Sequence, residues 1–307
     1  MKISIIGSGQ VGERVGRTFL YKGFDVLFYD VKDDVIKRLK RDGLNATNDP
    51  GVVINSTNTS FISVPTPIDD DGRYDYSYIR SVANTFGKLL KAKDDYHLFI
   101  LKSTVTPGTT EDIFIKELEK ASGKKLDSEF GVVYNPEFLT VIERTWTSDE
   151  KFKITPEKEG RIVIGLSERV LKGDDKRPID IIKEFYSGIN LPILTTDYKT
   201  AEFTKLAANN RLPLAISYSN ELFLFSQLLK ERGINIDIDF AIKAVHADPR
   251  IGPYGSVFGK AWGGPCFTKD TKAFERYFID TLGNSPKLVS NLIKINEEMK
   301  EKYGVRE

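Results

Sequence analysis

Short apolar runs alternate with segments of helical periodicity through the first 197 residues. Glycine, proline and other turn residues bound the apolar runs, and each run has the length of a buried strand. They occupy residues 1–6, 24–29, 60–64, 96–101, 131–134, 161–165 and 192–194. Between them, residues 13–20, residues 78–91 and the segment from 111 onward have the spacing of amphipathic helices. This alternation predicts an α/β fold built on a doubly wound sheet.

The pattern becomes helical after residue 197. Residues 200–232 form one long helical pattern interrupted only by Pro213, and residues 287–301 form a last helix. Long apolar helices of this kind often build a dimer core. We therefore predict two domains, a sheet domain over 1–197 and an all-helical dimerisation domain over 198–307.

Composition excludes several classes of protein. The chain has 307 residues with a formal net charge of +1, so charge gives no reason to expect a nucleic-acid, membrane or acidic partner. One cysteine and two histidines give neither an intrachain disulfide nor the ligand spacing of a metal site. No signal peptide or membrane-spanning run is apparent, so we expect a cytoplasmic location.

A glycine motif directly follows the first predicted strand. Gly7, Gly9 and Gly12 have the GxGxxG spacing, and Asp30 ends the second strand. In a Rossmann-like domain these glycines make the tight turn, admit a pyrophosphate and pack the helix on the strand. An acid at the Asp30 position accepts from the ribose hydroxyls and repels a 2′-phosphate. The motif predicts dinucleotide binding with NAD preferred over NADP; a glycine-rich turn without a ligand is the alternative.

Three further places carry candidate chemistry, each with a second interpretation. The hydroxyl-rich segment 102–111 follows a strand and predicts either a ligand loop or a helix cap. Glu137 also follows a strand, and it is either an acid on the protein surface or an acid of a functional site. Lys205 and Asn209 share one helix face, which is either a polar site or a solvated surface.

The only cysteine, Cys266, lies in the stretch Gly263-Gly264-Pro265-Cys266-Phe267-Thr268-Lys269-Asp270. A lone cysteine is usually a buried, inert apolar residue. Here two glycines allow close approach of a ligand, and a nearby lysine favours the nucleophilic thiolate. The stretch therefore predicts a nucleophile.

The order of these motifs resembles the nucleotide-sugar dehydrogenases, the family of UDP-glucose 6-dehydrogenase and GDP-mannose dehydrogenase. The resemblance rests on GSGQVG, SVPTP, KSTVTPGTTE, NPEFL, RIVIG, AEFTKLAANN, DPRIG and GGPCFTKD, which span nearly the whole chain. It implies oxidation of a sugar's primary alcohol to a carboxylate in two hydride transfers to NAD, through a cysteine-bound intermediate. UDP-glucose is the substrate we expect, and a homodimer the assembly.

The resemblance also assigns roles to individual residues. It implies that Cys266 is the nucleophile, that Lys205 and Asn209 stabilise the reacting oxygen, and that Asp270, Thr104 and Glu137 hold or activate water. It implies a cofactor site that includes, besides the glycines and Asp30, residues Gln10, Val11, Val64, Pro65, Thr66, Ser103 and Lys269. It implies sugar contacts from Phe138, Leu139, Gly263 and Arg250, the last reaching into the neighbouring subunit's site.

The chain departs from the family pattern at several positions. Family members commonly carry a further C-terminal domain, which we expect to be missing here. Pro265 stands where the family has serine, Val141 stands where a second glutamate is usual, and Trp262 replaces part of a glycine-rich approach. Two alternatives remain: a 3-hydroxyacid-type dehydrogenase, which needs no cysteine, and a non-catalytic NAD-binding dimer that acts as a partner or regulator.

Overall fold

The computed structural model describes residues 1–138, 160–264 and 266–306. Their contacts divide them into two compact units. Unit 1 contains residues 1–67, 74–138 and 160–205, and unit 2 contains residues 68–73 and 206–306, apart from residue 265. The predicted boundary between residues 197 and 198 falls at the start of the long helix α8 (Tyr198–Glu231), which begins in unit 1 and continues in unit 2.

Unit 1 is built on one eight-stranded sheet in the order β3-β2-β1-β4-β5-β6-β7-β8. All neighbouring strands are parallel except β6 and β7, which are antiparallel. The strands are β1 (Lys2–Ile6), β2 (Asp25–Tyr29), β3 (Ala46–Thr47), β4 (Thr59–Ile62), β5 (His97–Leu101), β6 (Phe130–Tyr134), β7 (Ile162–Leu166) and β8 (Ile193–Asp197). The predicted α/β class is confirmed, and the short β3 is an addition to the predicted strands.

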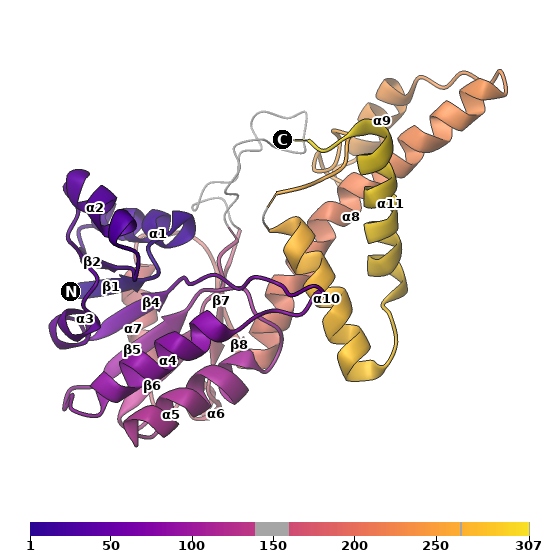
Figure 1. Cartoon of the computed structure of the whole chain (residues 1–307). Helices are drawn as coiled ribbons and strands as arrows, with labels where there is room; N and C mark the ends of the chain where they lie inside the picture. The colour runs from indigo at the N-terminus through magenta and orange to yellow at the C-terminus, as the bar shows by residue number, and fades with distance from the viewer. Residues whose placement is uncertain (139–159, 265, 307) are drawn as a thin grey trace. The chain divides into compact units, whose positions relative to one another are not determined.

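Helices cover both faces of this sheet (Figure 1). They are α1 (Gln10–Tyr21), α2 (Asp33–Arg41), α3 (Pro50–Ser56), α4 (Ser77–Leu90), α5 (Lys116–Ser122), α6 (Glu168–Lys172) and α7 (Arg177–Phe185). The helix predicted from residue 111 opens as a π-helix, η1 (Thr110–Ile115), before it continues as α5.

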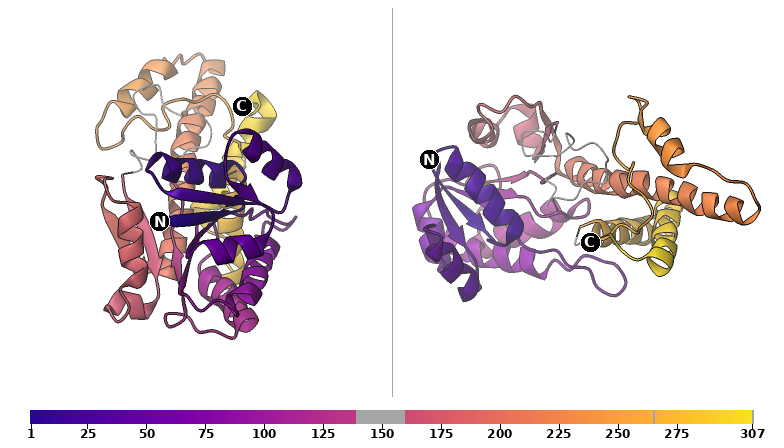
Figure 2. Two further views of the ribbon diagram at one scale, coloured as in Figure 1. Left: turned by 90° about the vertical axis from the view of Figure 1, so that its left-hand side faces the viewer. Right: turned by 90° about the horizontal axis from the view of Figure 1, so that it is seen from above.

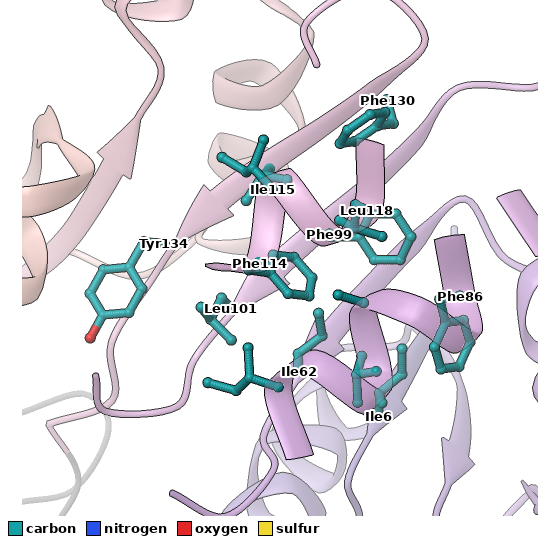
Figure 3. Packing of buried hydrophobic residues seen from close by; sticks show 14 of the residues in the cluster. Ile6, Ile62, Phe86, Phe99, Leu101, Phe114, Ile115, Leu118, Phe130 and Tyr134 are labelled. Carbon is teal, nitrogen blue, oxygen red and sulfur yellow. The ribbon is translucent and has the colours of Figure 1, made fainter. Parts of the chain in front are cut away.

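Strand alternation sorts the core of unit 1 into two layers. In β5, Phe99 and Leu101 pack under α4, η1 and α5, while Leu98 and Ile100 face the opposite layer with α1 and α7. Figure 3 shows Phe99 in the first layer beside Phe114 and Leu118. Because both faces are covered, the strands read as continuous apolar runs in the sequence.

The described part of unit 2 is helical. It contains the rest of α8, then α9 (Ile238–His246), α10 (Phe267–Leu282) and α11 (Lys287–Tyr303). In the right-hand view of Figure 2, α8 runs as one continuous helix, and Pro213 lies within it. Among the described residues, no helix combines the length and apolar character that crossing a membrane requires.

A buried carboxylate joins the first turns of α8 to the loop after β5. Glu202 is fully buried. Its two oxygens accept hydrogen bonds from the N–H groups of Gly108 and Thr110, at 2.6 and 2.7 Å, and from the Thr110 hydroxyl at 2.6 Å. Burial outweighs these bonds and raises the pKa of Glu202 from its ordinary value of 4.5 to about 7.

Replacing Glu202 by glutamine should remove a pH dependence of stability. Because the folded-state pKa of Glu202 is raised, its stabilising contribution is complete below about pH 4.5 and is lost as the pH rises through about 7. We therefore compare the unfolding free energies of the wild type and Glu202→Gln, measured in urea. The difference, wild type minus variant, should fall by at most about 3 kcal/mol between pH 4.5 and pH 8. Glu301→Gln, at an exposed position, is the matched control. Parallel pH profiles of the wild type and Glu202→Gln would contradict this assignment.

Candidate active site

The glycine motif forms the turn between β1 and α1 as predicted. Gly7 has a φ of +86°, and a Cβ there would lie 2.8 Å from the Ser63 carbonyl oxygen. A Cβ at Gly12 would lie 2.0 Å from the Gly7 carbonyl oxygen, so only glycine allows this approach of helix to strand. Gly9, by contrast, is exposed and has nothing within 4 Å of its Cβ position. The turn therefore has no room for a side chain at Gly7 or Gly12, whereas the space beside Gly9 is open.

The open side of this turn fits a dinucleotide phosphate. Gly9 is the N-cap of α1 and offers no side-chain cap, and Gln10 and Val11 are the first residues of the helix. The amide groups of a helix N-terminus without a cap bind anions, and no side chain at Gly9 obstructs them. β1 lies between β2 and β4, the reversal of strand order at which doubly wound sheets bind dinucleotides.

Asp30 lies beside this turn at the end of β2. Its carboxylate accepts from the Ser8 N–H at 2.9 Å and from the Lys32 N–H at 3.0 Å. These bonds hold the side chain at the carboxyl edge of the sheet. A carboxylate has further acceptor positions, which is what recognition of ribose hydroxyls requires.

The loops after β4 and β5 are bonded to each other. The Ser103 hydroxyl donates to the Val64 carbonyl at 2.7 Å, and the Thr66 hydroxyl donates to the Thr104 carbonyl at 2.9 Å. The structure therefore brings these predicted cofactor and water-binding residues together; Pro65 lies exposed between the two loop contacts. As N-cap of η1, Thr109 makes no side-chain capping bond, so the helix-cap interpretation of this hydroxyl-rich loop is not supported there.

Glu137 has a buried cationic partner that the sequence did not indicate. The Lys102 ammonium lies 3.4 Å from the Glu137 carboxylate and donates to the carbonyl and side-chain oxygens of Asn135, both at 3.1 Å. Asn135 in turn donates to the Val163 carbonyl at 3.0 Å. Glu137 is therefore a partly buried, paired acid and not a surface one.

The Phe138 ring contacts two cations within unit 1. The Arg161 guanidinium is 4.0 Å from the centre of its ring, and the Lys205 ammonium is 4.9 Å from it. Both distances are those of cation–π contacts. Lys205 and Asn209, one turn apart on α8, are each 7% exposed. The solvated-face interpretation of this pair is therefore wrong.

Unit 2 brings Asn209 together with the cysteine segment. The Asn209 amide donates to the Asp270 carboxylate at 2.6 Å, and the Lys269 ammonium lies 2.5 Å from the other Asp270 oxygen. Asp270 is 1% exposed, and its N–H donates to the Cys266 carbonyl at 2.8 Å in the first turn of α10. Cys266 is exposed at the N-cap position of α10, so it is not the buried, inert cysteine of the alternative interpretation.

The remaining predicted residues have mixed outcomes. Arg250 is exposed and makes a bidentate pair with Asp248, and its role toward a neighbouring subunit stays a prediction. Gly263 has a packing reason to be glycine, since a Cβ there would lie 2.5 Å from Val305. The place of Lys269 at the cofactor phosphates also stays a prediction. Leu139, Val141 and Pro265 lie outside the described residues.

Sequence reasoning missed Lys102, Arg161 and Glu202 as residues of this region. Each belongs to one of the family motifs KSTVTPGTTE, RIVIG and AEFTKLAANN, but the motif alone indicates no role for it. One feature of the sequence does point to such residues: a charged residue at the edge of an apolar strand or within an apolar helix. Burying an unpaired charge there costs free energy, so the residue needs a partner.

Two family models match the chain. The NAD binding domain of the UDP-glucose/GDP-mannose dehydrogenase family matches residues 34–189, and the central domain of the same family matches residues 199–298. The first match begins after the glycine motif, which directly follows β1 of the same eight-stranded sheet.

Individual relatives agree with the family models. The chain is 31% identical to UDP-glucose 6-dehydrogenase AglM of Haloferax volcanii, covering 98% of this chain and 71% of the relative. It is 30% identical to GDP-mannose 6-dehydrogenase of Pseudomonas syringae pv. tomato, covering 96% of this chain and 68% of the relative. A solved UDP-glucose dehydrogenase from Pyrobaculum islandicum superposes with a TM-score of 0.80 at 31% identity, covering 98% and 68% of the two chains. The chain therefore belongs to the UDP-glucose/GDP-mannose dehydrogenase family, whose members are NAD-dependent nucleotide-sugar dehydrogenases.

Proposed function

We propose that this protein oxidises UDP-glucose to UDP-glucuronate in two NAD-dependent steps through a covalent intermediate on Cys266. The observation that carries the proposal is the cluster in unit 2. There, an exposed cysteine begins a helix whose first turn bears a buried carboxylate bonded to Asn209. UDP-glucose is the sugar we propose because the UDP-glucose dehydrogenases named above are 31% identical to this chain; the GDP-mannose relative, at 30%, makes GDP-mannose the second candidate.

The glycine turn and Asp30 would hold NAD, which would supply the hydride acceptor for both oxidations. In the first, the Lys205 amine takes the proton of the sugar's primary alcohol while the carbon loses a hydride, which gives an aldehyde. The resulting ammonium then stabilises negative charge on the same oxygen. Lys205 is 7% exposed, so its amine acts away from bulk water in this proposal.

The second oxidation uses the thiol. The Cys266 thiolate adds to the aldehyde carbon to give a thiohemiacetal, whose carbon loses a second hydride to give a thioester. A primary amide carries two N–H donors, so Asn209 can bond Asp270 and an oxyanion with the same nitrogen. Water attacks the thioester, the Cys266 thiolate leaves, and the product is a carboxylate.

Three acidic or hydroxyl groups serve the water step in this proposal. Asp270 accepts a proton from the attacking water. Thr104 and Glu137, which is paired with Lys102, orient this water molecule. Phe138 and Gly263 contact the sugar, together with Leu139 and with Arg250 from a second subunit. The homodimer and the cytoplasmic location are parts of the same proposal.

NADH formation tests the activity directly. Purified protein with NAD should give two NADH per UDP-glucose consumed, and less or none with GDP-mannose and UDP-N-acetylmannosamine. A preference for one of the other two sugars would replace UDP-glucose and keep the chemistry. Measurable NAD binding with no NADH from any nucleotide sugar would instead favour the non-catalytic dimer.

Cys266→Ser should separate the two oxidations. Without the thiol no thioester forms, so we expect at most one NADH per sugar and an aldehyde that semicarbazide captures. Retention of two NADH per sugar would refute a covalent role for Cys266.

Lys205→Met should instead slow the first oxidation, by about 10²- to 10⁴-fold for loss of a general base.

Asp30→Asn should weaken the selection of NAD. The neutral amide no longer repels a 2′-phosphate and accepts fewer hydrogen bonds from the ribose. We expect KM for NAD to rise by about tenfold, corresponding to about 1.4 kcal/mol, and the ratio of NADP to NAD turnover to rise as well. An unchanged ratio would show that Asp30 does not face the ribose.

A further inference from the structure

The last two residues before the cysteine stretch are buried without belonging to a helix. Ala261 is 0% exposed and Trp262 is 3% exposed, and both lie outside the helices. Buried backbone N–H and C=O groups require hydrogen-bond partners. The path of residues 259–262 therefore depends on groups that come from elsewhere in unit 2.

Two asparagine side chains bond to backbone groups of residues 259, 260 and 262. Asn220 of α8 accepts from the Gly259 N–H at 2.8 Å and donates to the Lys260 carbonyl at 2.9 Å. Asn296 of α11 accepts from the Trp262 N–H at 2.8 Å and donates to the Trp262 carbonyl at 3.0 Å. Both amides use a donor and an acceptor at once, which neither alanine nor a carboxylate reproduces.

The segment after α11 completes the set. The Ala261 N–H donates to the Gly304 carbonyl at 3.0 Å, and the Arg306 N–H donates to the Ala261 carbonyl at 2.9 Å. Val305 lies so close to Gly263 that a Cβ on Gly263 would be 2.5 Å from its methyl carbon. We call Asn220, Asn296 and residues 304–306 the loop clamp.

Side-chain contacts link the loop clamp to the residue next to Cys266. The Trp262 indole N–H donates to the Ser217 hydroxyl at 2.8 Å. The indole ring meets the Phe267 ring edge-on, with centroids 6.4 Å apart and an interplanar angle of 84°. Phe267 follows Cys266 directly and is the first residue of α10. A displacement of Trp262 would therefore shift the start of α10.

We propose that the loop clamp positions Cys266 for the second oxidation, with Asn296 as its principal positioning residue. The proposal rests on the role of Cys266 given above. Asn296 is the principal residue because it binds both backbone groups of Trp262, the residue that contacts Phe267. It acts through Trp262 and does not touch the reacting atoms.

Asn296→Ala tests the proposal with two independent readouts. Hydrogen–deuterium exchange of the peptide over residues 259–266 should speed up by about tenfold, as for loss of a buried hydrogen bond. The second oxidation should slow by about 10- to 100-fold, as for a misplaced reacting group. Semicarbazide should then capture aldehyde, and NADH per sugar should fall below two while KM for NAD stays unchanged.

Two further variants keep the test decisive. Ser217→Ala removes only the bond to the Trp262 indole, so it should move both readouts in the same direction by less, even if Asn296→Ala does not fold. Asn284→Ala, at an exposed asparagine whose amide donates to the nearby Leu282 carbonyl, is the matched control and should change neither.

The outcomes separate this proposal from the proposed function. Unchanged exchange in both Asn296→Ala and Ser217→Ala would overturn the loop clamp. Faster exchange with two NADH per sugar retained would show that the loop clamp only stabilises the fold, which overturns the positioning role. A wild-type protein without NADH formation would refute the proposed function, and the positioning role with it, while the exchange data would still decide whether the loop clamp holds the segment.

Discussion

The burial of the Asp270 carboxylate is the constraint on which the rest of the cysteine region depends. A carboxylate at 1% exposure costs several kcal/mol unless it is paired and hydrogen-bonded. Asn209 and Lys269 provide those partners, one from α8 and one from the same turn of α10. The need to satisfy Asp270 therefore fixes the first turn of α10 against α8. Cys266, whose carbonyl accepts from the Asp270 N–H, is held by the same arrangement.

Unit 1 shows the same principle with a different carboxylate. Glu202 is buried against the N–H groups of the loop after β5, three residues before Lys205 on α8. Lys102 and Glu137 are a third case, in which each charge is the partner that the other needs. Separating the two partners of a buried ion pair costs more free energy than separating those of an exposed pair. These contacts hold their side chains in defined positions at the carboxyl edge of the sheet.

Local patterns in the sequence were sufficient for the parts of the structure that local interactions determine. The glycine turn, Asp30 and the strands of the sheet could be predicted because turn chemistry and apolar runs are read within a few residues. The two-residue β3 carries too little pattern to be seen. Partners such as Lys102 and Glu137, or Asn220 and Lys260, are far apart in the chain, and periodicity alone does not pair them. The roles of Cys266, Lys205 and Asn209 came from the resemblance, while their burial and contacts required coordinates.

The close approach of Val305 to Gly263 has a practical consequence for anyone who engineers this protein. Residues 304–306 pair with Ala261, so the chain beyond α11 is part of the support under the cysteine stretch. A tag, linker or fused domain attached at the C-terminus would exert force on residues 304–306 when it moves. A stiff fusion could thus alter the chemistry of the thiol without touching it, whereas a flexible glycine-serine spacer would transmit little force.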